Sequence, residues 1–305
     1  MLRKEPFRGS GRSDIVDTVP VLTEGPPVTS LPTASSSSVL APLTFLVPSS
    51  EKPKVVMPAN HADPIERTGT YRSVPVAIHD ARHLPVPPTT DREGFALVRS
   101  PTKDVDFLDA ALVEDRYYAE VMELLKSCTG ATEVHVFDHT VRVEDEGTQR
   151  RAGLRQPVAF VHNDYTEKSA RQRVRDFFPP REAERLLAGR IALVNAWRPI
   201  SASAERFPLA AADGRSVPQA DYVAVDMIYV DRIGEIYHNT YSSGQRWFYF
   251  ADMRPDEVML LKCFDSAADG RTRYTAHTGF ANPLAAPGTP PRRSVEVRTI
   301  LSFAS

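Results

Sequence analysis

His162 and Asp164, a base and an acid two positions apart, follow the short apolar run from Val158 to Val161. Alternate residues of a strand point to the same face, so this spacing predicts an imidazole and a carboxylate side by side. A second histidine, His277, closes another strand-like run far downstream. Two histidines and one carboxylate on one side of a metal, with other positions open, form the facial triad of non-haem Fe(II) oxygenases. The spacing therefore predicts an iron site made by His162, Asp164 and His277.

Two alternatives to this triad are present in the chain. His61 and Asp63 repeat the same spacing, but they lie among prolines outside any predicted strand, where no rigid backbone would aim their side chains. His139 is the rival ligand, because it lies in a predicted strand beside Asp138. Each histidine taken alone is more often structural than metal-binding.

A basic pair precedes the last predicted strand. Arg292 and Ser294 share a face by strand parity. A planar guanidinium binds a carboxylate through two parallel hydrogen bonds, and a neighbouring hydroxyl can add a third. We expect Arg292 and Ser294 to bind the far carboxylate of a dicarboxylate cosubstrate whose other end chelates the metal. Arg298 lies on the same face and is the alternative anchor. If Arg292 has no binding role, it forms a solvated basic pair with Arg293.

Four further residues are expected to border a substrate. Tyr165 directly follows the predicted carboxylate ligand, and Asn195 shares one strand face with Trp197, with Arg198 beside them. A packed tryptophan and a structural amide are equally good interpretations of the latter group. The polar helical stretch from 167 to 188 follows the ligand strand and is either a lid or a solvated face.

The elements that must position these residues are mostly short strands. The series of short strands with turn signals between them predicts a mainly β fold with flanking helices, either a sandwich or a jelly-roll barrel, and we expect the double-stranded β-helix (jelly-roll) core. A stripe that includes Tyr117, Val121, Leu125 and Cys128 predicts one helix before the strands, ended by Gly130. No glycine-rich nucleotide loop occurs. The expected strands cover residues 71–78, 94–98, 134–141, 157–162, 191–197, 222–230, 235–241, 246–250, 258–264, 271–277 and 294–303.

Composition divides the chain into two parts. Residues 1–65 hold the serine run from Ser35 to Ser38 and many prolines, which predicts a disordered or draped segment. Folded structure is expected to begin near Tyr71, with the jelly-roll oxygenase domain spanning residues 66–305.

Bulk properties exclude several classes of protein. The net charge of −2 gives no support to a nucleic-acid partner or an anionic membrane surface. No apolar run approaches the roughly 20 residues that cross a bilayer, and no targeting peptide is predicted. The two cysteines, Cys128 and Cys263, lie far apart, which favours a reducing compartment, and we expect a cytoplasmic location.

Five motifs, in this order, resemble the AsaB-like hydroxylase/desaturase family of Fe(II)/2-oxoglutarate-dependent oxygenases, which includes the fungal gibberellin desaturase. The resemblance implies an oxidoreductase of secondary metabolism. It would use Fe(II), 2-oxoglutarate and dioxygen to hydroxylate or desaturate a small molecule, with decarboxylation of 2-oxoglutarate to succinate. The motifs are Val161-His162-Asn163-Asp164-Tyr165-Thr166, Asn195-Ala196-Trp197-Arg198-Pro199-Ile200, Met253-Arg254-Pro255-Asp256-Glu257-Val258, His277-Thr278-Gly279-Phe280, and the run from Pro290 to Arg298.

Two other functions compete with this interpretation. A cupin-type metal enzyme without an organic cosubstrate would need a further histidine near the first pair, which only His139 offers. A non-catalytic binding protein on the same barrel would not need the triad. The substrate, the choice between hydroxylation and desaturation, the stereochemistry and the oligomeric state do not follow from the sequence.

Overall fold

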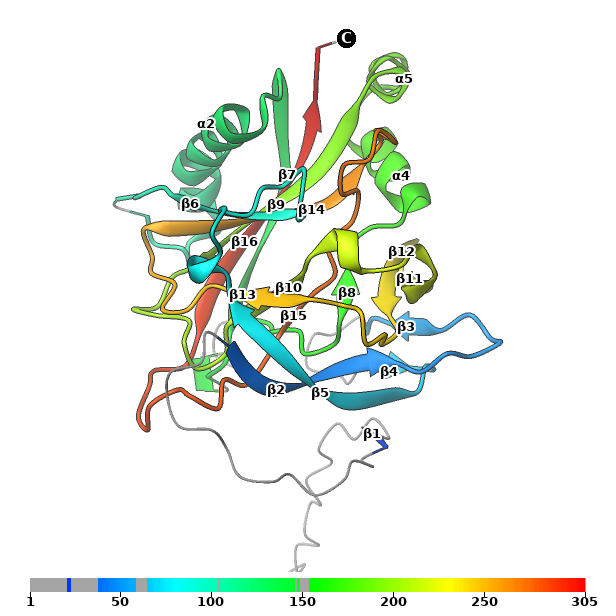
Figure 1. Ribbon diagram of the computed structural model, residues 1–305. Coiled ribbons are helices and arrows are strands. Elements are labelled where there is room, and N and C mark those ends of the chain that lie inside the picture. The colour runs from blue at the N-terminus through cyan, green and yellow to red at the C-terminus, as the bar shows by residue number, and fades with distance from the viewer. Residues whose placement is uncertain are drawn as a thin grey trace, which may run out of the picture.

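The computed structural model describes residues 21–22, 38–58, 65–103, 105–145, 147–148 and 154–304. The second H-x-D motif, His61 to Asp63, lies outside these residues. Two curled antiparallel-rich sheets face each other and form a jelly roll, with helices on the outside (Figure 1). The predicted mainly β fold is confirmed.

The larger sheet carries both predicted histidine ligands. Its strands run in the order β1-β5-β13-β10-β15-β8-β12-β11-β3-β4, and β2 pairs with β5. Their bounds are β1 (Val21–Leu22), β2 (Ser38–Leu46), β3 (Lys54–Val56), β4 (Glu66–Arg67), β5 (Tyr71–Asp80), β8 (His162–Asn163), β10 (Leu209–Ala212), β11 (Tyr222–Ile228), β12 (Ile233–Asn239), β13 (Trp247–Tyr249) and β15 (His277–Gly279).

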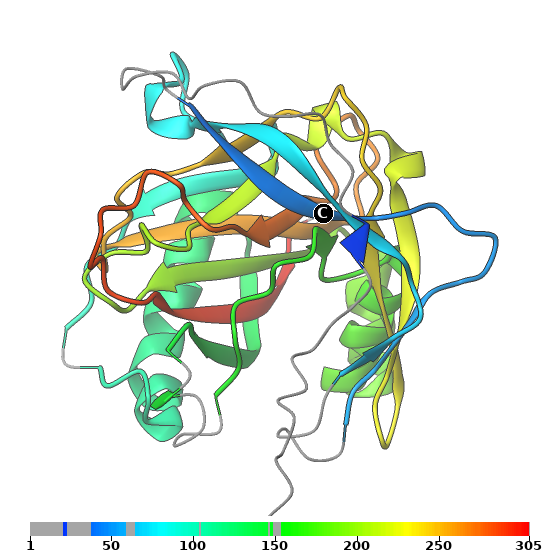
Figure 2. The ribbon, with the colours of Figure 1, turned by 90° about the horizontal axis from the view of Figure 1, so that it is seen from below.

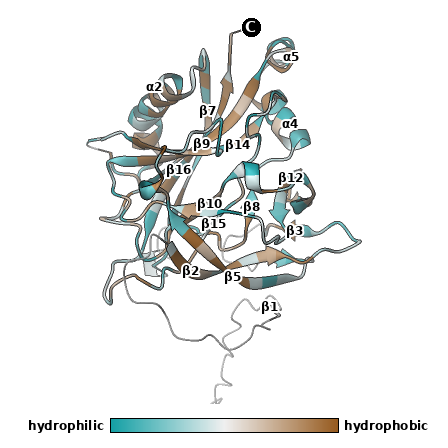
Figure 3. Ribbon diagram, in the orientation of Figure 1, coloured by the Kyte–Doolittle hydropathy of each residue, from teal (hydrophilic) through white to brown (hydrophobic). Residues whose placement is uncertain are grey.

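The smaller sheet, ordered β6-β14-β9-β16-β7, carries the arginines. Its central strand β9 is mostly apolar, whereas helix α4 (Glu167–Phe177) is mostly hydrophilic (Figure 3). All nine residues of β9 are buried because both faces of this strand are covered. The bounds are β6 (Phe95–Arg99), β7 (Glu133–Val143), β9 (Ile191–Pro199), β14 (Glu257–Asp265) and β16 (Arg293–Ser302).

Helices cover the outside of the smaller sheet and one end of the barrel. The predicted stripe is correct for Val121 and Leu125 of α2, which are buried, but wrong for Cys128, which is exposed; Gly130 ends the helix with a positive φ of 73°. Thr166 and Ser169 form a capping box at the start of α4, directly after Asp164. The bounds are α1 (Ala110–Leu112), η2 (Val113–Tyr117), α2 (Tyr118–Thr129), α4 (Glu167–Phe177) and α5 (Pro180–Ala188), with single turns η1 (Ala81–His83), η3 (Gly214–Ser216) and η4 (Gln219–Asp221).

Two apolar clusters hold these layers together. The first lies between the sheets and includes Phe45, Trp247 and Phe264. The second joins the outer face of the smaller sheet to α2 and includes Val121 and Val297. Because strand residues alternate, β16 gives Val295 and Val297 to the outer cluster and leaves its other face toward the barrel interior.

The expected start of folded structure near Tyr71 is wrong for the segment from 38 to 46. Strand β2 pairs antiparallel with β5 over its whole length, and the two ribbons lie side by side in Figure 2. Val39, Ala41, Leu43 and Phe45 are buried on one face. This strict alternation is a strand signal, but Pro42 and the preceding serines obscured it. The expected disorder is also wrong for Val21–Leu22 and Lys54–Val56, which form β1 and β3 of the larger sheet, and it stays a prediction for the residues before 65 that lie outside the described ranges.

The two ligand-bearing strands are shorter than expected. Strand β8 contains only His162 and Asn163, and β15 begins at His277, whereas the sequence predicted that a strand ends there. The residues before His277 bond to a loop instead, since Thr272 N donates to the carbonyl of Asp91 and Thr275 Oγ1 to that of Gly94. Strand β10 was not predicted, because its run Leu209–Ala212 has no alternation.

Candidate metal centre

Three donor atoms converge where β8 and β15 meet. His162 and His277 lie opposite each other in this strand pair, with their ring centroids 4.4 Å apart. Asp164 Oδ1 lies 3.4 Å from His162 Nε2 and 3.9 Å from His277 Nε2. The ligand atoms of the three residues are all within 4.8 Å of one another. The structure thus brings together the three residues that the sequence singled out.

Both imidazoles are held in the tautomer that a metal requires. His162 Nδ1 lies 2.8 Å from the carbonyl oxygen of Phe160, and His277 Nδ1 lies 2.9 Å from that of Thr275. A carbonyl oxygen only accepts hydrogen bonds, so each Nδ1 carries the proton. Each Nε2 then presents its lone pair toward Asp164, as in metal sites whose histidines are oriented by a backbone carbonyl.

The carboxylate of Asp164 is fixed from its other side. Asn195 Nδ2 donates to Oδ2 across 2.8 Å, and Arg298 Nε donates to the same oxygen across 3.2 Å. Oδ1 therefore remains directed at the two histidines. Burial would raise the pKa of Asp164, but the contact with His162 and the charge of Arg298 lower this pKa well below its usual range.

Burial and the neighbouring His162 lower the pKa of His277, which keeps this imidazole neutral. A neutral imidazole and an ionised carboxylate are the forms that bind a cation. Two imidazole nitrogens and one carboxylate oxygen also match the facial donor set of non-haem iron. The three side chains thus fit Fe(II) in donor type, protonation state and mutual distance.

Asn163 locks the backbone of the metal-binding loop. Its Nδ2 donates to the carbonyls of Tyr165 and Cys263, and its Oδ1 accepts from Thr275 N. The side chain is fully buried. One amide thus ties the loop that carries Asp164 to the segment that leads into His277.

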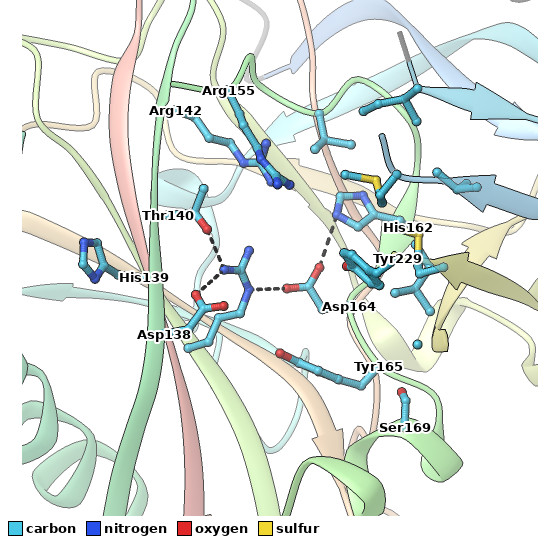
Figure 4. Close-up of a pocket in the computed structure, with 18 of the residues that line it drawn as sticks. Asp138, His139, Thr140, Arg142, Arg155, His162, Asp164, Tyr165, Ser169 and Tyr229 are labelled. Atoms are coloured by element: carbon cyan, nitrogen blue, oxygen red, sulfur yellow. Dashed lines mark hydrogen bonds and ion pairs between the residues drawn. The ribbon is translucent and has the colours of Figure 1, made fainter. Parts of the chain in front are cut away.

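The rival ligand, His139, lies on the other side of β7 from Asp164 (Figure 4). Its Nδ1 is 2.7 Å from the hydroxyl of Tyr118 on α2. The metal-binding group found among the described residues does not include it. Its neighbour Asp138 faces the site and accepts from Arg298 NH1 at 2.8 Å.

A cavity of about 1560 Å³ is lined by two of the three donors, His162 and Asp164. Tyr165 is one of its lining residues, and because β8 ends at Asn163, strand alternation does not set the direction of this side chain. Helix α4 contributes Ser169, Arg173 and Phe177 to the wall. The polar stretch after the ligands is therefore a wall of the cavity.

The other residues expected to touch a substrate have different contacts. Asn195 binds Asp164 and Glu296. Trp197 is buried beneath the guanidinium of Arg292, whose Cζ lies 5.2 Å from the ring centroid. Arg198 points to the opposite face of β9, where it donates to Tyr117 Oη at 2.8 Å. This position removes Arg198 from the residues that can reach a substrate in the cavity, because α2 covers that face.

Arg298 of β16 and Arg292, which immediately precedes this strand, differ in how much hydrogen-bonding capacity they retain. Arg298 donates to Asp164, Asp138, Thr140 and Glu296, and these bonds use four of its five N–H groups. Despite burial, the surrounding carboxylates raise the pKa of Arg298 well above its usual value. It holds the metal-binding carboxylate and has little capacity for a cosubstrate.

Arg292 lies buried on the same strand face and donates from NH1 to the carbonyl of Phe207 at 2.9 Å. Its Nε is buried and has no hydrogen-bond partner in the described part of the chain. Burial, and then the charge of Arg142, lower the pKa of Arg292 to about 9. Ser294 is buried two positions further on. A buried guanidinium with an unused donor is suited to an anion.

Three residues that matter to the site were missed. Glu296 joins Asn195 and Arg298, and the repeat Arg292, Ser294, Glu296, Arg298 along one strand face could have indicated it. Arg142 and Arg155 both line the cavity but lie in segments without a motif. Only the folded chain brings these two together.

Fold and site together define a jelly-roll oxygenase of the Fe(II)/2-oxoglutarate-dependent class, an oxidoreductase. A family profile described as an oxidoreductase/YMDC permease-like domain matches residues 43–302. The chain belongs to this family, and with it to the AsaB-like fungal hydroxylases/desaturases.

The relatives agree with this assignment. The hydroxylase/desaturase efuI of Hormonema carpetanum is 31% identical over 76% of this chain and 84% of its own length. The hydroxylase/desaturase asaB of Aspergillus flavus is 40% identical over 40% of this chain and 60% of its own length. A solved structure of the iron and alpha-ketoglutarate-dependent endoperoxidase NvfI superposes with a TM-score of 0.78 at 27% identity, over 89% of this chain and 100% of that one. In the described residues, no helix is long and apolar enough to cross a membrane.

Proposed function

We propose that His162, Asp164 and His277 hold Fe(II) in an enzyme that hydroxylates or desaturates a small secondary metabolite. The observation that carries this proposal is the convergence of two Nε2 atoms and one carboxylate oxygen within 4.8 Å, at the edge of a large cavity. Iron bound there, with 2-oxoglutarate and dioxygen, supplies an oxidant that removes hydrogen from an unactivated C–H bond.

The protein's own groups divide the remaining tasks. Asn195 and Arg298 direct Oδ1 of Asp164 at the metal position by holding Oδ2. Arg292, helped by Ser294, binds the far carboxylate of 2-oxoglutarate, because its buried Nε has a donor to spare. Tyr165 and the aromatic walls contributed by Phe137 and Phe160 exclude water and orient the organic substrate.

Two measurements test the proposal. The first is turnover of 2-oxoglutarate with Fe(II) and ascorbate, measured as succinate formed, and the second is Mn(II) binding measured by calorimetry. Wild type is expected to bind one metal and to form succinate. His162→Ala should lose both, whereas His139→Ala should keep both, since His139 faces α2. Wild-type protein that neither binds metal nor forms succinate would refute the proposal.

We also propose a cytoplasmic location, because Cys128 and Cys263 are both free. Fluorescence microscopy of the tagged full-length chain tests this, and a signal confined to the secretory pathway would contradict it.

A further inference from the structure

Arg142 and Arg155 meet inside the cavity although they come from different segments. Arg142 lies on β7. Arg155, which follows later in the chain, lies beside it, and the two residues form a parallel β-bridge. Val143 N donates to the carbonyl of Arg155 at 3.0 Å, which fixes the second segment against the strand. Figure 4 shows the two guanidinium groups side by side, facing the space next to His162 and Asp164. The backbone thus holds two positive charges together.

Three other arginines of the cavity wall, Arg298, Arg173 and Arg232, each have a carboxylate partner. Arg298 is bound to Asp138, Asp164 and Glu296. Arg173 pairs with Asp176 at 3.4 Å, and Arg232 pairs with Asp231 at 3.3 Å.

Arg142 and Arg155 differ from these arginines. Arg142 donates from NH1 to the carbonyl of Gln156 at 2.9 Å, and within the described ranges neither guanidinium is in an ion pair. Burial, and beyond it the charges of Arg298 and Arg155, lower the pKa of Arg142. Two adjacent cations in a partly desolvated site repel each other, and an anion placed between them would stabilise both.

We propose that Arg142 and Arg155 bind a carboxylate of the organic substrate, so that the substrate of this oxygenase is an organic acid. That the bound acid is the substrate of an oxygenase rests on the proposed function. That the arginine pair binds a carboxylate does not. Two forked guanidiniums present parallel donors that suit a carboxylate.

The place of the pair separates it from the cosubstrate site. Arg155 is exposed and Arg142 half-buried, so the pair reaches from the cavity mouth inward, whereas Arg292 is buried. The apolar part of the cavity includes Met57, Phe160 and Met227. An acid bound by the arginine pair can therefore lay its hydrocarbon over the metal position, against this apolar wall.

The test compares octanoate with 1-octanol, which share a carbon skeleton and differ in the carboxylate. Each is titrated calorimetrically into wild-type protein loaded with Mn(II) and 2-oxoglutarate, and into metal-free protein. Wild type is expected to bind octanoate about ten- to a hundredfold more tightly than 1-octanol, the range of charge-assisted hydrogen bonds. The double variant Arg142→Gln/Arg155→Gln should lose this preference and keep its affinity for 1-octanol and for 2-oxoglutarate.

Arg232→Gln is the matched control, because it removes a cavity arginine that already has a partner. It should leave the preference for octanoate unchanged. If the double variant fails to fold by circular dichroism, Arg155→Gln alone is used, since Arg155 is exposed and its loss spares the interior.

Three results would overturn the inference. Wild type could bind both probes equally, or the double variant could retain the preference for octanoate. The double variant could instead lose 2-oxoglutarate affinity while its preference for octanoate persists, which would assign the pair to the cosubstrate. Failure of the proposed function gives a different result. Wild-type protein would then bind neither Mn(II) nor 2-oxoglutarate, while the metal-free protein would still bind octanoate.

Discussion

Arg298 Nε lies 3.2 Å from Oδ2 of Asp164, on the side of the carboxylate away from the two histidines. This contact joins the two sheets, since Arg298 belongs to β16 of the smaller sheet and Asp164 directly follows β8 of the larger one. The geometry of the metal site thus depends on how the sheets pack together, as well as on the strands that carry the ligands.

Arg298→Gln is expected to weaken metal binding without abolishing it. The variant keeps all three donors but releases Oδ2 of Asp164 from a charged partner. Loss of such outer partners typically costs about ten- to a hundredfold in metal affinity. Calorimetric titration with Mn(II) measures the change.

Arg293→Gln is the matched control, because Arg293 is the exposed neighbour on the same strand. Its metal affinity should equal that of wild type. An Arg298→Gln protein with wild-type affinity would show that Asn195 alone orients the carboxylate.

Arg292→Ala is expected to raise the 2-oxoglutarate concentration needed for half-maximal turnover by about ten- to a hundredfold, because the far carboxylate loses charge-assisted hydrogen bonds. Mn(II) affinity should not change. Succinate formation at varied 2-oxoglutarate, beside a Mn(II) titration, separates the two effects.

Ser294→Ala should change the 2-oxoglutarate requirement in the same direction by a smaller factor, since it removes one neutral donor. The assignment of the anchor fails if Arg298→Gln raises this requirement and Arg292→Ala does not.

The metal donors could be predicted because local rules define them. The spacing of His162 and Asp164 predicted that the two side chains lie together, as they do although β8 ends at Asn163, and His277 belongs to another apolar element that had to lie in the same barrel. The contacts of Asn195 and Arg298 with Asp164 depend on inter-sheet packing, and the sequence carries no local signal for that. The sequence pattern therefore suggested that Asn195 contacts a substrate, whereas in the fold Asn195 donates to Asp164, the metal-binding carboxylate.

Strand limits failed where tertiary contacts replaced ladder pairing. Residues before His277 have strand-like composition, yet Thr272 N donates to the carbonyl of Asp91 in a loop and Thr275 N donates to the side-chain oxygen of Asn163. In β2, by contrast, the composition did not predict a strand but the fold forms one. Pro42 is accommodated because β2 pairs only with β5 at this position and needs no backbone N–H for a second neighbour. In both segments the secondary structure is decided by the residues that pack against the segment, and not by its composition.

Phe45→Ala is expected to lower the free energy of unfolding by about 3–5 kcal/mol. The side chain is fully buried, and its ring packs edge-on against Tyr241 and Trp247 at centroid distances of 5.4 and 5.9 Å. Urea unfolding followed by tryptophan fluorescence measures the loss.

Leu40→Ala on the same strand is the control, because Leu40 is 52% exposed and its loss should stay within about 0.5 kcal/mol. Equal stabilities for the two variants would mean that β2 contributes little to the folded domain.

Asp265→Asn is expected to destabilise the protein at neutral pH and much less in acid. Asp265 is fully buried between Arg190 Nη2 at 2.7 Å and Lys262 Nζ at 2.9 Å. Burial would raise the pKa of Asp265, but the Arg190 hydrogen bond and the Lys262 charge lower it below its usual value. Because the folded-state pKa is depressed, the stabilisation is complete above the unfolded pKa of about 3.9 and disappears as the pH falls toward the folded value.

At pH 7 the variant should lose about 3 kcal/mol, since Lys262 remains buried with one partner fewer. Urea unfolding at neutral pH and below pH ~3.9 should show the gap between wild type and variant narrowing as carboxylates protonate. Asp269→Asn, which removes an exposed carboxylate paired with Arg271, should leave stability nearly unchanged at both pH values. A gap that stays constant with pH would indicate that Asp265 stabilises the fold by packing and not by its charge.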